Sequence, residues 1–222
     1  RAGYAERIGG WTRVSNTQIT GTPRKIFDFV TLSSQNLLFI GTELKVFLEN
    51  AGTFNDITPI RSTVTLGSNP VNTTGGAGSG VVTITTQSAH GAATSDFVTL
   101  ASLTATDGIT AAQLNTEHQI TSVPSSTTFT IDTGGSASSG STAGGGSSGT
   151  AAFQITTGLN TTVLGSGWGA GTWGRFTWGS GAGSLSGQTL RLWSADNFGE
   201  DLIFNIADST IYYWDATNGT ST

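Results

Sequence analysis

Short stretches in which apolar and polar residues alternate occur near both ends of the chain. In the N-terminal part, this pattern predicts strands at 24–32, 36–42, 44–50 and 54–60. Alternation with period two, in segments rich in aromatic and β-branched residues, is typical of β-strands. Turn-forming residues at 41–43 and 50–52 separate the second, third and fourth segments. The pattern therefore predicts four short antiparallel strands, as in one propeller blade or part of a β-sandwich.

The C-terminal part repeats this pattern. The segment 202–214 aligns with 37–49, because each has two apolar residues and a phenylalanine, then polar residues, then a second apolar segment. A preceding strand is predicted at 188–194, and the stretch 196–201 is expected to form a polar loop between strands. We therefore expect a second blade of the same kind.

The middle of the chain differs from both ends. Two stretches rich in Gly, Ser and Thr surround residues 81–132, and we interpret them as flexible linkers or sliding strand edges. Between them, strands are predicted at 81–86, 96–100, 118–123 and 127–132, with a hairpin turn at 124–126. This segment is predicted to be a small β-barrel inserted into a loop of the surrounding domain.

The predicted fold class is all-β, with propeller-like blades of short antiparallel strands and an inserted small β-barrel. Residues 1–63 form the first blade region, and residues 64–157 form the barrel module with its Gly/Ser/Thr-rich linkers. Residues 158–222 hold a Trp/Gly-rich segment and the second blade region. Because the sequence contains no Met and begins with Arg1, we expect a processed chain or part of a longer one.

Composition narrows the possible functions. Charged residues make up 10% of the chain, against roughly 25% in typical soluble domains, which favours a subunit whose surface is covered by neighbours. The net charge of −5 and the lack of a basic run argue against a sequence-specific nucleic-acid reader or a membrane-surface binder. The chain has no cysteine, which excludes disulfides and thiolate chemistry.

The stretch GWGAGTWGRFTWGSG at 167–181 holds Trp168, Trp173 and Trp178 among glycines. One interpretation is a platform on which sugars or bases stack, since aromatic faces bind bases with about 1–3 kcal/mol each. The interpretation we favour is that the tryptophans are buried between blades or subunits, because glycine lets the backbone approach closely. The same packing role is predicted for the other three tryptophans, which are Trp11, Trp193 and Trp214.

Few polar residues suggest chemistry, and no catalytic or metal-binding residue is predicted. A metal site would require His90 and His118 to converge with a carboxylate, and we instead expect a turn residue and a surface strand residue. Asp196, Glu200 and Asp201 could form a general acid–base pair or a calcium site, but a polar loop explains them more simply.

A structural role is predicted for Asp56 and Pro59. Asp56 can accept backbone hydrogen bonds that fix the turn into Pro59, or it can pair with Arg61. Pro59 lacks the N–H that a strand ladder requires, so it should end a strand or lie at a sheet edge.

Two groups of motifs resemble known families. ERIGGW and GTELKVFLENAGTFNDITPIR, followed by the Trp/Gly segment, LRLWSADNFGEDLIFN and IYYWD, resemble tail nozzle (tail tubular) proteins of short-tailed bacteriophages. The N-terminal positions that carry this resemblance are Gly9, Gly10, Trp11, Gly41, Thr42, Phe47, Leu48, Gly52, Asp56, Ile57, Thr58, Pro59 and Arg61. The inserted segment resembles a small β-barrel module first described in ubiquitin-activating enzymes, through His90-Gly91, Asp96-Phe97-Val98, Leu114-Asn115, QITSV and TTFTI. Ser95 stands where that module is expected to have glycine.

The resemblance implies a virion structural protein located in the phage tail. Several copies would form a ring, expected to be sixfold, around a channel through which the genome leaves the capsid. Expected partners are other copies of the chain, an adaptor protein, fibres and passing DNA that is not bound specifically. Neither a cofactor, nor a small-molecule substrate, nor enzymatic activity is expected.

Two other classes stay open. The chain could be a receptor-binding adhesin, or a fibre or decoration protein, that recognises host-surface glycans. It could also be a propeller enzyme that cleaves polysaccharides, in which case replacing Asp201 should abolish activity.

Overall fold

A four-stranded antiparallel sheet forms the N-terminal part of the computed structural model, which describes residues 10, 15–140, 142–158, 190–207 and 209–219. Its strands are β1 (Pro23–Val30), β2 (Asn36–Thr42), β3 (Val46–Asn50) and β4 (Thr53–Asp56), in the order β1-β2-β3-β4. Ala51 and Gly52 both have positive φ angles in the turn between β3 and β4. Two such residues define the turn that best matches the twist of a hairpin, so the predicted turn at 50–52 is confirmed.

A three-stranded antiparallel sheet forms the C-terminal part, with strands β12 (Trp193–Phe198), β13 (Asp201–Ile206) and β14 (Ile211–Trp214). A short 3-10 helix, η1 (Ala216–Asn218), follows. The predicted polar loop at 196–201 is wrong. Asp196 and Asn197 pair with Ile203 and Leu202 in the β12–β13 ladder, and only Gly199 and Glu200 remain for the turn. Ladder hydrogen bonds here outweigh the turn preference of Asp and Asn.

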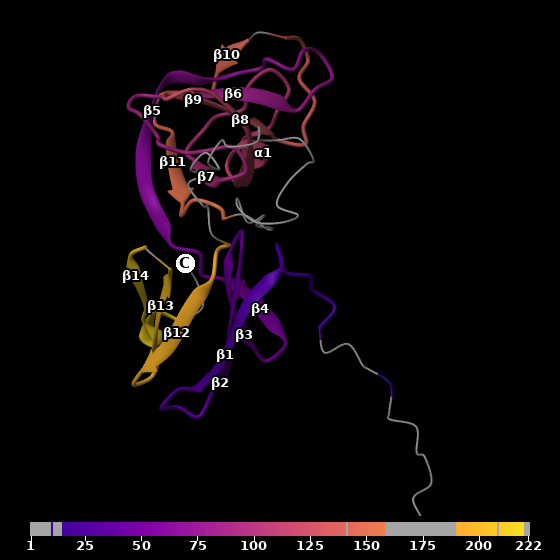
Figure 1. The fold of residues 1–222 in the computed structure, drawn as a ribbon. Coiled ribbons are helices and arrows are strands. Elements are labelled where there is room, and N and C mark those ends of the chain that lie inside the picture. The colour runs from indigo at the N-terminus through magenta and orange to yellow at the C-terminus, as the bar shows by residue number, and fades with distance from the viewer. Residues whose placement is uncertain (1–9, 11–14, 141, 159–189, 208, 220–222) are drawn as a thin grey trace, which may run out of the picture.

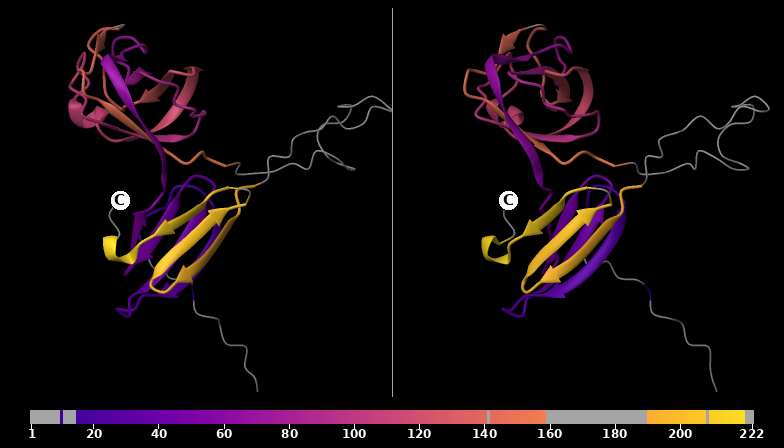
Figure 2. Two further views of the ribbon diagram at one scale, coloured as in Figure 1. Left: turned by 90° about the vertical axis from the view of Figure 1, so that its left-hand side faces the viewer. Right: turned by 60° about the vertical axis from the view of Figure 1, so that its left-hand side comes forward.

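These two sheets pack face to face, and Figure 2 shows β12–β14 as a layer over β1–β4. We call this pair of sheets the sandwich. Trp193 is 5% exposed in the sandwich core, where its indole N–H donates to the carbonyl of Thr42 at 2.8 Å. The core contains ten buried residues, namely Phe29, Leu37, Phe39, Val46, Leu48, Ile57, Ile155, Trp193, Leu202 and Phe204.

The middle of the chain forms a closed barrel, which lies at one end of the sandwich in Figure 1. Six strands follow one another around it: β5 (Ile60–Asn72), β11 (Thr150–Gln154), β7 (Phe97–Ala101), β8 (Glu117–Ser125), β9 (Thr128–Asp132) and β6 (Val81–Thr86). Pairing between β5 and β6 closes the ring. The predictions of an all-β chain and of an inserted small barrel are therefore confirmed.

The barrel has its own core and one short helix. Buried residues from all six strands and their connections fill the interior, including Ile84, Leu100, Ile120, Phe129 and Phe153. The helix α1 (Ala111–Leu114) begins with a capping box, in which Thr110 and Gln113 bond each other's backbone N–H groups.

The Gly/Ser/Thr-rich stretches are part of the barrel, so their interpretation as flexible linkers is wrong. The strand β10 (Ala143–Gly144) pairs with β5. The carboxylate of Asp107 accepts hydrogen bonds from the Thr73 hydroxyl at 2.8 Å and from the Ser139 backbone N–H at 3.0 Å. These bonds tie the two stretches to one loop. The β8–β9 turn also lies at 126–127 rather than 124–126, which leaves Pro124 within β8.

Candidate functional site

Lys45 joins the barrel to the sandwich. It lies in the β2–β3 turn, is 4% exposed, and its Nζ atom donates to Asp56 Oδ2 and to Glu117 Oε1, each at 2.5 Å. Asp56 ends β4 of the sandwich, whereas Glu117 begins β8 of the barrel. Gln154 Nε2 donates to the second oxygen of Glu117 at 2.6 Å. One buried ammonium group therefore binds a carboxylate from each part of the molecule.

A second polar contact fixes the chain where it leaves the barrel. Asp96 is fully buried, and its carboxylate accepts from the backbone N–H groups of Ala93 and Thr157, both at 2.9 Å. Arg61 Nη2 lies 3.9 Å from the same carboxylate. The bond from Thr157 holds the segment that follows β11 against the loop before β7. In the described structure, Asp96 therefore fixes the path of the chain as it leaves the barrel.

Arg191 is buried beside this junction. Burial lowers the pKa of its guanidinium to about 10, an effect that the negative charges of Asp96 and Glu43 oppose. Its guanidinium carbon lies 5.5 Å from the centre of the Trp193 ring. Arg191 therefore packs against the sandwich core as a buried cation.

The structure places Asp56 and Pro59 at this junction. Asp56 Oδ1 accepts from the Thr58 backbone N–H at 2.9 Å, as expected for a residue that fixes the following turn. Its ionic partner is Lys45, while Arg61 lies near Asp96, so the proposed Asp56–Arg61 pair is wrong. Pro59 lies between the end of β4 and the start of β5.

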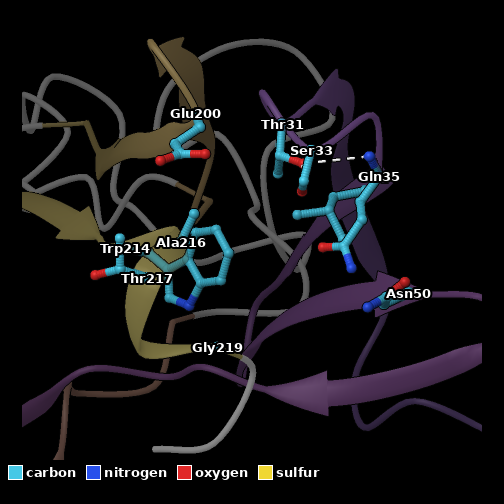
Figure 3. A pocket seen from close by; sticks show the side chains of 10 residues that line it. Thr31, Ser33, Gln35, Asn50, Glu200, Trp214, Ala216, Thr217 and Gly219 are labelled. Atoms are coloured by element: carbon cyan, nitrogen blue, oxygen red, sulfur yellow. Dashed lines mark hydrogen bonds between the residues drawn. The ribbon is translucent and has the colours of Figure 1, made fainter.

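A cavity of about 210 Å³ opens at the end of the sandwich opposite to the barrel junction (Figure 3). Lys45 at the junction precedes β3, whereas Asn50 at the last position of β3 lines the cavity. The β1–β2 turn, the end of β3, the β12–β13 turn and the segment after β14 surround it. Its lining consists of Thr31, Ser33, Gln35, Leu37, Asn50, Glu200, Trp214, Ala216, Thr217 and Gly219. We call this cavity the end pocket.

Trp214 forms the aromatic part of the end pocket. Its ring contacts Phe29 of the sandwich core edge to face, with ring centres 6.3 Å apart. The Thr31 hydroxyl, across the cavity, accepts from the Gln35 backbone N–H at 3.2 Å and holds the β1–β2 turn. The Trp214 indole thus packs at the edge of the sandwich core and also lines the end pocket. The β1–β2 turn, which the Thr31 hydrogen bond holds, faces it across the cavity.

Three polar side chains around the end pocket have no hydrogen bond to any other described residue. They are the amides of Gln35 and Asn50 and the carboxylate of Glu200, which Figure 3 shows around Trp214. Among the described residues of the lining, Glu200 is the only charged one, and it is negative. The end pocket therefore offers one aromatic surface, two amides and one carboxylate to a ligand.

Hydrogen bonds to aspartates fix the segment that follows β14. Asp201 Oδ1 accepts from the Ala216 backbone N–H at 2.9 Å, and Oδ2 accepts from the Tyr213 hydroxyl. The bond to Asp201 raises the pKa of Tyr213 to about 12. Hydrogen bonds from the hydroxyl and the backbone N–H of Thr217 lower the pKa of Asp215, which caps η1. Of the three carboxylates considered in the sequence, Asp196 lies in β12, Glu200 in the β12–β13 turn and Asp201 at the start of β13.

The face of the four-stranded sheet that points away from the sandwich core carries apolar residues interleaved with polar ones such as Asp28, Asn36 and Glu49. The strand register places six apolar residues on it, namely Ile26, Val30, Leu38, Ile40, Phe47 and Phe54. Of the six apolar residues, Ile26 is 58% exposed and Val30 is 54% exposed, whereas Ile40 and Phe47 are buried. We call this surface the first outer face.

The three-stranded sheet also exposes apolar side chains on the face away from the core. Phe198, Ile211 and Tyr213 are exposed there, with Ile203 opposite Tyr213 in the β13–β14 register. We call this surface the second outer face. Each sheet of the sandwich therefore has apolar residues on both of its faces.

The two histidines lie inside the barrel, so the expectation of a surface position for His118 is wrong. His118 is buried with Nε2 at 3.1 Å from the Leu114 carbonyl. His90 is buried with its ring stacked on Phe153, ring centres 5.4 Å apart, and its Nδ1 accepts from the Ala92 backbone N–H. Among the described residues, no group of three or more His, Asp or Glu side chains could hold a metal ion.

Four of the six tryptophans proposed as packing residues lie outside the described residues, namely Trp11, Trp168, Trp173 and Trp178. Trp193 and Trp214 lie in and at the edge of the sandwich core. The sequence did not predict the end pocket, because Gln35, Asn50 and Glu200 lie in three separate turns or strand ends that only the packing of the two sheets brings together.

Neither a protein-family model, nor a curated protein, nor a solved structure was found to match this chain. No helix among the described residues is long and apolar enough to cross a membrane.

Proposed function

We propose that this chain is a structural subunit of a bacteriophage tail nozzle, in which several copies form a ring around a channel for genome ejection. The observation that carries the proposal is the set of exposed apolar side chains on the two outer faces. The solvent-facing side of an antiparallel sheet is usually polar. Here Ile26 and Val30 on one sheet, and Phe198 and Ile211 on the other, are exposed. Several large apolar side chains exposed on one sheet face favour an interface with a neighbour.

The finer fold that goes with this proposal is a propeller. The four-stranded and three-stranded sheets would be consecutive blades, since each is an antiparallel meander and the two pack face to face. In a propeller, each inner blade packs against a neighbour on both faces. The two outer faces supply the surfaces that the next blades, or neighbouring copies of the chain, would cover.

The charge of the chain supports a conduit rather than a nucleic-acid reader. The net charge is −5, and ionic attachment to DNA requires clustered Lys and Arg. A channel wall through which DNA passes should not bind it tightly. The proposed role thus needs neither a cofactor nor a catalytic group, and its neighbours would be other copies of the chain, an adaptor and fibres.

Sedimentation velocity of the purified chain over a range of concentrations tests whether the outer faces mediate self-association. Burying an isoleucine contributes about 1.5–3 kcal/mol, so Ile26→Lys should weaken association by about tenfold or more. The matched control is Ile60→Lys, which places the same charge at a similarly exposed isoleucine on β5, outside both outer faces.

A chain that stays monomeric at every concentration would contradict the proposal. Equal weakening by both substitutions would also contradict it, because association would then depend on charge rather than on the first outer face.

A further inference from the structure

We propose that the end pocket binds one ring of a neutral carbohydrate. The inference does not rest on the nozzle assignment, because it uses only the lining of a single chain. It starts from the contrast between Trp214, which is partly buried, and the three polar side chains around it, which have no hydrogen-bond partner among the described residues.

The size of the end pocket favours a small ligand. Its volume of about 210 Å³ is far larger than one water molecule requires and smaller than the roughly 300–1,000 Å³ typical of drug-sized ligand sites. A single sugar ring with its hydroxyl groups is of this scale. Further rings of an oligosaccharide would extend into solvent, because exposed residues such as Ser33 and Gln35 form the rim.

The chemistry of the lining matches a sugar more closely than other small ligands. The apolar C–H face of a pyranose packs on an aromatic ring, and Trp214 offers such a ring. Hydroxyl groups both donate and accept hydrogen bonds. The amides of Gln35 and Asn50 supply both functions, and the carboxylate of Glu200 accepts two or more hydrogen bonds.

The charge of the lining selects a neutral sugar. No other described residue of the lining than Glu200 is charged, and the chain as a whole has a net charge of −5. A sialylated or phosphorylated sugar would meet this carboxylate without a compensating cation in the lining. The negative charge of the lining therefore favours uncharged sugars, such as hexoses and N-acetylhexosamines.

The lining is held in shape before a ligand arrives, which lowers the entropy cost of binding. On one side, Thr31 bonds the backbone of Gln35 and fixes the β1–β2 turn. On the other side, Asp201 bonds the backbone of Ala216 and fixes the segment after Trp214. Neither Thr31 nor Asp201 needs to contact the sugar to serve this positioning role.

Saturation-transfer NMR with the full chain, together with tryptophan fluorescence titration, tests the proposal. The probes are the methyl glycosides of glucose, galactose and mannose, then N-acetylglucosamine, with N-acetylneuraminic acid as the anionic comparison. We expect binding of at least one neutral probe and none of N-acetylneuraminic acid. Gln35→Ala and Glu200→Gln should each weaken that binding by about three- to tenfold, the effect of one lost hydrogen bond.

The matched control is Asn36→Ala, an exposed neighbour that does not line the pocket, and it should leave the affinity unchanged. Trp214→Phe tests the stacking surface while keeping an aromatic contact to Phe29. No binding of any neutral probe, binding that survives both Gln35→Ala and Glu200→Gln, or stronger binding of N-acetylneuraminic acid would each overturn the proposal. None of these results bears on self-association through the outer faces, so the two proposals fail independently.

Discussion

Single side chains on the second outer face contact one another across strands. Tyr213 is exposed on β14, yet its hydroxyl donates to the Asp201 carboxylate at the start of β13. The same carboxylate holds the backbone of Ala216 and so shapes the end pocket. Asp201 thus connects the exposed sheet face to the end pocket. The pKa of Tyr213 indicates whether its hydrogen bond to Asp201 is formed.

Titration of the tyrosines by ultraviolet absorbance should show this contact directly. The hydrogen bond to Asp201 raises the pKa of Tyr213 from 10.0 to about 12, so one phenol should ionise late. The chain has three tyrosines, and Tyr213→Phe should remove the late phase while Tyr212→Phe retains it. A late phase that persists in Tyr213→Phe would contradict this contact.

The same shift predicts how stability changes with pH. The folded state holds the Tyr213 proton up to about pH 12, whereas an unfolded chain loses it near pH 10. The contribution of this bond to folding is therefore complete below pH 10 and is lost as the pH rises towards 12. Chemical unfolding of the wild type and Tyr213→Phe on both sides of pH 10 measures the difference.

At the scale of the elements, the sandwich depends on the close approach of β2 and β12. Gly41 lies under the Trp193 indole, and a Cβ atom at that position would lie 2.4 Å from indole Cδ1. No real Cβ contact is that short, so the strand or the indole would have to move. The indole is also held by its hydrogen bond to the Thr42 carbonyl, which restricts that movement.

Gly41→Ala should therefore destabilise the chain by about 1–3 kcal/mol, the usual cost of overpacking a core. Urea unfolding followed by tryptophan fluorescence measures it. Gly67→Ala is the control, because Gly67 lies in β5 and a Cβ atom there would meet only Gln87, at 3.8 Å. Equal effects of the two substitutions would contradict the packing of Trp193 on Gly41.

Local sequence patterns predicted most strands and the pairing of strands joined by short turns, but not the long-range pairings that close the barrel. The four N-terminal strands and the barrel strands at 81–86 and 127–132 were legible from alternation and turn residues. The strand predicted at 188–194 was placed too early, since β12 runs from Trp193 to Phe198 and its Asp and Asn are turn formers that the ladder with β13 overrides. The ordered Gly/Ser stretches depend on hydrogen bonds to Asp107, a residue more than thirty positions from Ser139. The end pocket depends on how two sheets meet, which no local pattern encodes.

At the scale of the whole molecule, Lys45 connects the barrel to the sandwich. Its ammonium group is buried, whereas the Asp56 and Glu117 side chains are about one third exposed. Removing the cation would leave two neighbouring carboxylates without their partner, in a place where water only partly solvates them. The contact thus contributes to the stability of the junction rather than to either core.

Lys45→Met should destabilise the chain by about 1–3 kcal/mol, the cost of leaving partly buried charged partners unpaired. Lys25→Met is the control, since Lys25 forms no ion pair with any described residue. Urea unfolding of both variants gives the comparison. An unchanged stability in Lys45→Met would show that the junction does not depend on these ion pairs.

The central claim is that neighbouring copies cover the outer faces in a ring around a channel. Electron microscopy of the native assembly that contains this chain tests it most directly, through the symmetry of the assembly and the surroundings of Ile26 and Val30. The account predicts a closed ring with a continuous axial channel, in which both residues are buried against a neighbour. A threefold spike, a filament or a separate surface knob, with these residues in solvent, would contradict it.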